Sequence, residues 1–158
     1  MRILVAVAER GTPELLAGLD RLVPLRGSEL LLVHVIDNGA RGEMELARGR
    51  LLPRPIPKHR LRAIGEAERR AAELALDEAA TAAESLGAMP ETLAAAGEPG
   101  RVVSRLAGER SCDLVAVSAR VDRQHERPGP HSVGHTARFV VDHSPRPVLL
   151  LRGPVAIA

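Results

Sequence analysis

The sequence has 158 residues, a length that fits one compact domain and leaves too little chain for a second independent core. Hydrophobic residues make up 45% and charged residues 27%, so most of the chain is expected to fold. The formal net charge is only +2 and Phe139 is the sole aromatic residue, which argues against a general nucleic-acid-binding protein, because such proteins combine clustered cations with aromatic stacking platforms.

The first elements follow directly from the apolar pattern near the amino terminus. Residues 3–8 form a short aliphatic run, typical of a strand covered on both faces in a parallel sheet. Thr12 and Pro13 predict a helix start, with Thr12 as the side-chain cap, and apolar residues follow at helical spacing, namely Leu15, Leu16, Leu19, Leu22 and Val23. The sequence therefore opens with a strand and an amphipathic helix.

The second strand and the longest helix come next. Residues 30–36 (LLLVHVI) predict another buried strand, in which His34 is expected to be a satisfied interior histidine. Residues 37–57 carry several glycines, prolines and arginines, which predict a long exposed loop with one helical turn near residues 44–47. The Ala, Glu, Arg and Leu composition of residues 61–86 predicts a long helix that ends at Gly87.

The third and fourth strands are shorter. Residues 92–96 form a weak, alanine-rich strand, supported mainly by the regular alternation of the elements around it. A turn at residues 97–100 leads to a short helix over residues 102–107. Residues 113–117 (DLVAV) predict the fourth strand, and the polar residues 118–131 predict a loop.

The carboxyl-terminal segment completes the alternation of strand and helix. Ser132 is expected to cap a helix that Pro145 ends, and residues 147–151 (PVLLL) predict the last strand. Alternating strands and helices with long crossovers predict a doubly wound α/β sheet with right-handed connections. We expect a single domain over residues 1–158, with the loops at 37–57 and 118–131 as insertions within it.

Five segments of the chain resemble the universal stress protein family in order and position. They are RILVAVAERG, LLLVHVID, GEPGRVVSRLA, CDLVAVSAR and SVGHTARFVVDHSPRPVLLL. The resemblance covers nearly the whole chain and implies five parallel strands in the order 3-2-1-4-5, with helices on both faces. It also implies a homodimer that pairs through the last strand, with Val148, Leu149 and Leu151 at the seam. The alternative is that PVLLL is an ordinary edge strand covered by its own helices.

The ligand site of an open α/β sheet lies beyond the carboxyl ends of its strands, at the switch point between the first and fourth strands. Where the family binds ATP, an Asp follows the last valine of the first strand. The phosphates then sit in a loop patterned Gly-x-x-Gly, nine residues, and Gly-Ser. Mapped on this chain, the candidate binding residues are Ala8, Val35, Ser118, Arg120, Gly134, His135 and Thr136.

This sequence departs from the family pattern at four places. Ala8 stands at the Asp position, and Ser118 and Val121 replace the first two loop glycines. The final pair is Gly134-His135, and twelve residues rather than nine separate Val121 from Gly134. Glycines let backbone N–H groups approach phosphate, whereas a β-branched valine resists the left-handed backbone of a tight turn. We therefore expect weak or no ATP binding and no bound cofactor.

A weaker form of nucleotide binding stays open as the alternative. Arg120, Arg123 and Arg127 lie in the enlarged loop, where they would either pair with phosphate oxygens or face water. His135 and Thr136 at a helix start are also suited to donate to an anion. On this reading ATP, AMP or another phosphorylated molecule is the ligand.

Enzymatic and metal-binding functions find little support in the sequence. Ser118 follows a strand but lacks the flanking glycines of a nucleophile elbow, and no paired carboxylates suggest general acid–base chemistry. His131 and His135 have the i, i+4 spacing of a metal pair, but no further ligand is fixed by spacing. We predict no enzyme and no metal site, and leave weak ATP hydrolysis open.

Two functions of different class remain. The first is a cytoplasmic regulatory protein of the stress-response type, a homodimer that acts through protein partners without nucleotide. The second is a sensor whose altered loop accepts an adenine nucleotide or a related ligand. The lone Cys112 excludes an intrachain disulfide, and no apolar segment has the length of a membrane span or of a signal peptide, so the cytoplasm is the expected compartment.

Overall fold

The computed structural model describes residues 1–37, 58–119 and 133–152. Within these ranges, parallel strands form one sheet in the order β3-β2-β1-β4-β5, which confirms the predicted fold class and strand order. The strands are β1 (Arg2–Ala6), β2 (Glu29–Asp37), β3 (Met89–Gly97), β4 (Leu114–Ser118) and β5 (Val148–Leu151).

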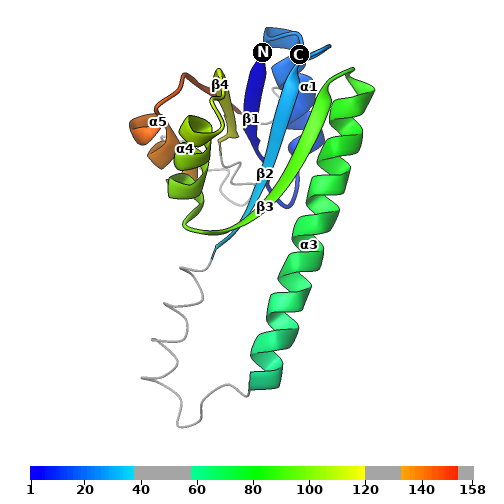
Figure 1. Cartoon of the computed structure of the whole chain (residues 1–158), viewed down its shortest axis with the longest axis vertical. Coiled ribbons are helices and arrows are strands. Elements are labelled where there is room, and N and C mark those ends of the chain that lie inside the picture. Colours follow the sequence, from blue (N-terminus) through cyan, green and yellow to red (C-terminus); the bar gives the residue numbers. More distant parts are fainter. Residues whose placement is uncertain (38–57, 120–132, 153–158) are drawn as a thin grey trace, which may run out of the picture.

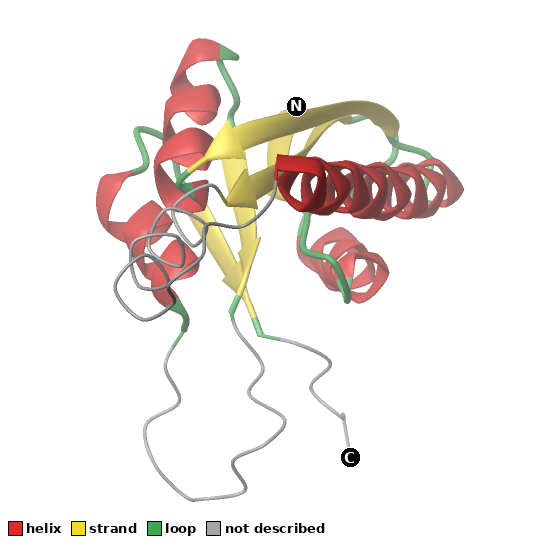
Figure 2. Ribbon diagram, turned by 90° about the horizontal axis from the view of Figure 1, so that it is seen from below, coloured by secondary structure: helices red, strands yellow, loops and turns green. Residues whose placement is uncertain are grey.

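Helices cover both faces of this sheet (Figure 2). They are α1 (Thr12–Leu22), α3 (Lys58–Ser85), α4 (Pro99–Glu109) and α5 (His135–His143). Helices α1 and α3 pack on one face over Ile3 and Val5, while α4 and α5 pack on the other face over Leu4 and Val115. Because both faces are buried, the central strands read as continuous aliphatic runs instead of alternating polar and apolar residues.

Helix α3 is much longer than the strands it covers. Its 28 residues span about 42 Å at 1.5 Å per residue. The nine residues of β2 reach only about 30 Å. The amino-terminal half of α3 therefore projects past the carboxyl end of β2 (Figure 1). This half of α3 does not cover the sheet, and it can therefore form a wall beyond the ends of the strands.

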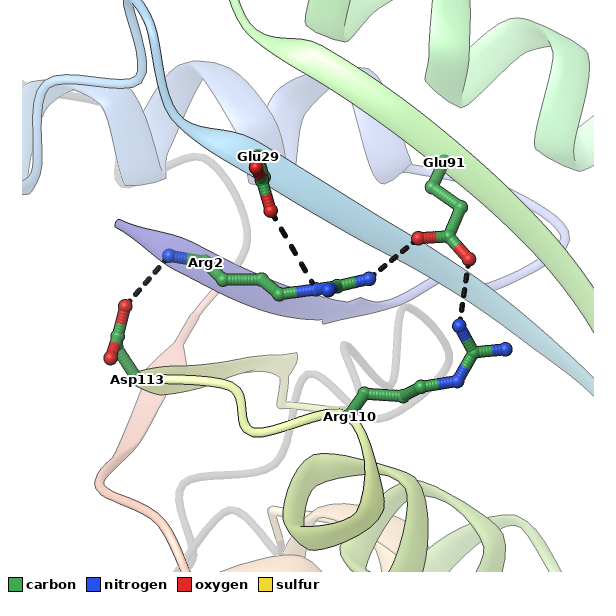
Figure 3. A network of polar contacts seen from close by, with 5 residues as sticks. All are labelled: Arg2, Glu29, Glu91, Arg110 and Asp113. Atoms are coloured by element: carbon green, nitrogen blue, oxygen red, sulfur yellow. Dashed lines mark hydrogen bonds and ion pairs between the residues drawn. The ribbon is translucent and has the colours of Figure 1, made fainter.

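A polar network ties the strands together at the opposite, amino-terminal end of the sheet (Figure 3). The guanidinium of Arg2 lies 2.6 Å from the carboxylate of Glu91 and 3.9 Å from that of Glu29, and Arg110 lies 2.9 Å from Glu91. The backbone N–H of Arg2 donates to Asp113 at 2.8 Å. These groups are partly solvated, so each ion pair contributes at most about 1 kcal/mol.

Cys112 lies next to this network as a buried free thiol. Burial raises the pKa of Cys112 above its usual value, against the opposing effect of the nearby Arg2, Arg146 and Arg110 guanidinium groups. A raised pKa keeps the thiol protonated near neutral pH, and the side chain packs as a small apolar residue of the core around α4 and α5.

Two predicted helix caps are wrong. The N-cap of α1 is Gly11, in the left-handed conformation at φ 84°, and Thr12 is the first helical residue. The Thr12 hydroxyl instead donates back to the carbonyl of Ala8 at 3.3 Å. Helix α5 is capped by Gly134, so it begins after the predicted Ser132 cap, which lies outside the described residues. In both places a glycine takes a backbone conformation that propensity rules for side-chain caps do not anticipate.

Several other predicted boundaries move by a few residues. Asp37 closes β2 instead of opening the loop, and Pro99 and Gly100 belong to α4 instead of the preceding turn. Asp113 precedes β4, and residues 38–57 and 120–132, with the helical turn predicted near 44–47, lie outside the described residues. In the part of the chain that the structure describes, no helix combines the length and apolarity needed to cross a membrane.

The contact between α4 and α5 rests on a glycine. A Cβ added at Gly100 would lie 2.8 Å from the Cβ, Cγ and Cδ1 atoms of Phe139, whose ring also stacks on His143 at 4.1 Å. We expect Gly100→Ala to destabilise the protein by about 1 kcal/mol, because the steric cost exceeds the gain in helix propensity. Urea denaturation of purified protein measures this change.

Gly18 in α1 supplies the matched control for that substitution. No atom lies within 4 Å of a Cβ added at Gly18. Gly18→Ala should therefore stabilise the protein by about 0.5–1 kcal/mol through helix propensity alone. The same sign of change for both substitutions would contradict the close packing of Phe139 on Gly100.

Candidate functional site

A cavity of about 710 Å³ lies at the carboxyl ends of β1, β2 and β4. Its floor is formed by strand ends, and one side is formed by Ile64, Ala67 and Ala71 of the projecting half of α3. The other side is formed by the starts of α4 and α5, including Pro99 and Ala137. The volume falls within the range of small-molecule pockets in proteins, and the walls are mostly aliphatic.

The position of the cavity follows from the strand order. β1 pairs with β2 on one side and with β4 on the other, so the connections after β1 and β4 leave toward opposite faces of the sheet. Such a switch point leaves a crevice that neither connection fills. The length of α3 then closes one side of the crevice.

The structure brings together most of the site residues predicted from the sequence. Ala8, Val35, Ser118 and Thr136 all line the cavity. Gly134 and His135 immediately precede Thr136 at the start of α5 but are not part of the lining, and Arg120 lies outside the described residues. The role of these residues in binding a ligand stays a prediction.

Gly134 holds a conformation that only glycine adopts readily. Its φ of 90° and ψ of 155° lie in a region that is essentially closed to residues with a Cβ. Its carbonyl accepts the first hydrogen bond of α5, from Arg138 N at 3.0 Å. This glycine therefore sets the direction from which α5 enters the sheet and aims Thr136 at the cavity.

Sequence reasoning missed the charged part of the lining. Glu9 follows β1, Asp37 ends β2, and Glu68 lies on α3, and all three line the cavity. No Lys or Arg belongs to the lining within residues 1–37, 58–119 and 133–152. Glu9 and Asp37 were detectable as acidic residues at predicted strand ends, whereas Glu68 depends on how far α3 projects, for which the sequence carries no signal.

His34 also lines the cavity, although the sequence analysis did not place it among the site residues. It is 8% exposed, on the face of β2 that packs toward α3. Its Nδ1 lies 3.1 Å from the carbonyl oxygen of Val7, and because a carbonyl only accepts, Nδ1 carries the proton and donates. His34 is therefore an interior histidine, as expected, and its Nδ1 has a hydrogen-bond partner.

The polar groups of the lining are few. The hydroxyl groups come from Ser118 and Thr136, and no hydrogen bond joins either hydroxyl to a general base within the described chain. The described residues also hold no group of three or more His, Cys, Asp or Glu side chains placed to bind a metal ion. An aliphatic cavity with a few polar groups is typical of a small-molecule binding site.

A comparison with models of protein families identifies the family of this chain. The family model for the universal stress protein family matches residues 1–152. The chain belongs to the universal stress protein family. No curated protein sequence matches this family member.

Solved structures support the same fold for this universal stress protein. The universal stress protein UspA from Lactobacillus plantarum superposes with a TM-score of 0.71 at 20% identity, covering 96% of this chain and 97% of that chain. A universal stress protein from Archaeoglobus fulgidus in complex with dAMP gives 0.65 at 19% identity, covering 95% and 96%. A family protein from Arabidopsis thaliana with AMP bound gives 0.64 at 15% identity, covering 98% and 93%. At these identities the likeness establishes the fold.

Proposed function

We propose that this protein is a cytoplasmic, non-catalytic regulatory member of the universal stress protein family that binds ATP weakly or not at all. Two lining residues carry the proposal. Ala8 and Ser118 line the cavity at positions where the ATP-binding pattern of the family has Asp and Gly. Ala8 offers no hydrogen bond to a sugar, and Ser118 adds a side chain where bare backbone would approach phosphate.

The charge of the cavity supports the same conclusion. Its described lining carries the carboxylates of Glu9, Asp37 and Glu68 and no Lys or Arg. A triphosphate binds where backbone N–H groups and cations converge on its oxygens, and carboxylates in the lining disfavour an anionic ligand. The triphosphate is therefore the part of ATP that this cavity fits worst.

A monophosphate ligand is the second candidate. Gly134 is retained as the N-cap of α5, and Thr136, the second residue of that helix, lines the cavity. A helix start attracts a single phosphate through its N–H groups and dipole. The solved relatives with dAMP or AMP bound make an adenosine monophosphate the reasonable form of this alternative.

We further propose that the protein forms a homodimer through the outer edge of β5. Val148, Leu149, Leu150 and Leu151 are all only half-buried within one chain. An apolar edge strand invites pairing with another strand, and a second copy of this chain would cover it. In this dimer the cavity of each copy, at the carboxyl ends of β1, β2 and β4, would stay separate from the paired edge of β5.

Thermal unfolding with magnesium-ATP tests the proposed function. If the dissociation constant were 10 µM, about 1 mM ATP would stabilise the protein by about 2.7 kcal/mol, or about 5–10 °C in Tm. We expect a shift within the scatter of repeated melts. Magnesium with inorganic triphosphate is the control, because it matches the ionic strength and charge without the nucleoside. A rise in Tm that grows with ATP concentration and is absent in the control would overturn the proposal.

A further inference from the structure

His34 has one nitrogen whose hydrogen-bonding capacity is unused in the described structure. Its Nδ1–H donates to the Val7 carbonyl at 3.1 Å, and in the neutral imidazole this makes Nε2 an acceptor. Within the described residues, the imidazole makes that one hydrogen bond. The side chain is 8% exposed and lines the cavity. His34 Nε2 is not among the buried side-chain atoms without a partner in the described residues, so this nitrogen is accessible from the cavity.

The surroundings of His34 leave room for a ligand atom. Helix α3 contributes the small residues Ala67 and Ala71 to the lining, together with Ile64 and Glu68. On β3 the residue in register with His34 is Ala94. The hydrogen bond to the Val7 carbonyl holds the imidazole ring of His34 in one orientation at the cavity. The result is a fixed acceptor in a mostly aliphatic cavity of about 710 Å³.

We propose that His34 is a ligand-recognition residue whose Nε2 accepts a hydrogen bond from an N–H donor of an uncharged, nucleoside-sized molecule. The aliphatic walls bind the flat or apolar body of that molecule, and His34 selects its donor group. This inference rests on the proposed function, because it takes the cavity as the binding site and assigns no role to phosphate. A site built to satisfy a buried acceptor discriminates against ligands that lack the matching donor.

Adenosine and purine riboside provide the test, because they differ only by the exocyclic amino group. We expect wild-type protein to bind adenosine about fivefold more tightly than purine riboside, as one net hydrogen bond predicts. In His34→Asn, the shorter amide retains a donor for the Val7 carbonyl but has no acceptor at the Nε2 position. This variant should bind both nucleosides equally, with the affinity of the wild type for purine riboside. Competition titration calorimetry measures the four affinities.

A second measurement does not depend on how the variant folds. In protein labelled with ¹⁵N at histidine, adenosine should shift the Nε2 resonance of His34 toward that of a hydrogen-bonded acceptor, whereas purine riboside should not. Equal affinity of the wild type for the two nucleosides, no saturable binding of adenosine, or an unchanged Nε2 resonance would each overturn the assignment of His34. Tighter binding of magnesium-ATP than of adenosine would instead overturn the proposed function, and the nucleoside pair would still decide the role of His34.

Discussion

Leu150→Pro is expected to convert the proposed dimer to a monomer while leaving the fold intact. Val115 N donates to the Pro147 carbonyl and Ala119 N to the Leu151 carbonyl, so odd-numbered residues of β5 direct their peptide groups toward β4. The N–H of Leu150 therefore faces the free edge, where proline is tolerated. In a two-fold dimer both copies lose an N–H, which should weaken association about 100-fold, or about 2.7 kcal/mol.

Leu150→Ala is the matched control for this prediction. It removes the same apolar packing against the α4 and α5 side of the core but keeps the outward N–H. Sedimentation velocity should show a dimer for the wild type and for Leu150→Ala, and a monomer for Leu150→Pro, with circular dichroism unchanged among the three. A monomeric wild type, or two variants that dissociate equally, would contradict pairing through the backbone of β5.

Gly134→Asn should produce the largest loss of stability among the glycine substitutions. At φ 90° and ψ 155° any side chain is strained, and asparagine gains no relief there, so we expect a cost of about 2 kcal/mol in the free energy of unfolding. For a chain of this length that corresponds to a fall of about 4–8 °C in Tm. Because Gly134 directs α5, this variant should also lose the Thr136 side of the cavity.

Gly11→Asn separates backbone strain at Gly134 from a general effect of asparagine. Gly11 has φ 84° and ψ 9°, close to the left-handed helical region that asparagine tolerates, and an added Cβ meets only Glu14 Oε2, at 4.0 Å. Its cost should be less than about 1 kcal/mol. Denaturant unfolding of the two variants side by side measures the difference in the free energy of unfolding. Equal losses of stability would contradict the claim that the backbone conformation at position 134 requires glycine.

The alternation of strands and helices could be predicted from strong apolar signals in the sequence, whereas the strand order came from the resemblance to the universal stress protein family. Residues 3–8 and 30–36 are short, almost continuous aliphatic runs, the pattern typical of a parallel strand covered on both faces. Once the order was set, Ala8, Val35 and Ser118 could be placed at one edge of the sheet, since parallel strands end together. Thr136 joined them because α5 must start at that same edge.

The remaining lining residues could not be predicted for a physical reason. Glu68 reaches the cavity because α3 runs beyond the end of β2, and nothing in its sequence fixes how far a helix of that composition projects. The caps at Gly11 and Gly134 depend on positive φ angles that the chain path imposes. His34 was correctly expected in the interior, but its place in the cavity lining depends on how α3 packs beyond the end of β2, which is a matter of tertiary packing.

Titration calorimetry of the wild-type protein with magnesium-ATP tests most directly whether this cavity has lost the means to hold a triphosphate. We predict no saturable heat up to about 1 mM ligand, which corresponds to a binding free energy weaker than about −4 kcal/mol. A one-to-one isotherm with a micromolar dissociation constant, with the adenine nucleotide seated between β1 and β4, would contradict the account.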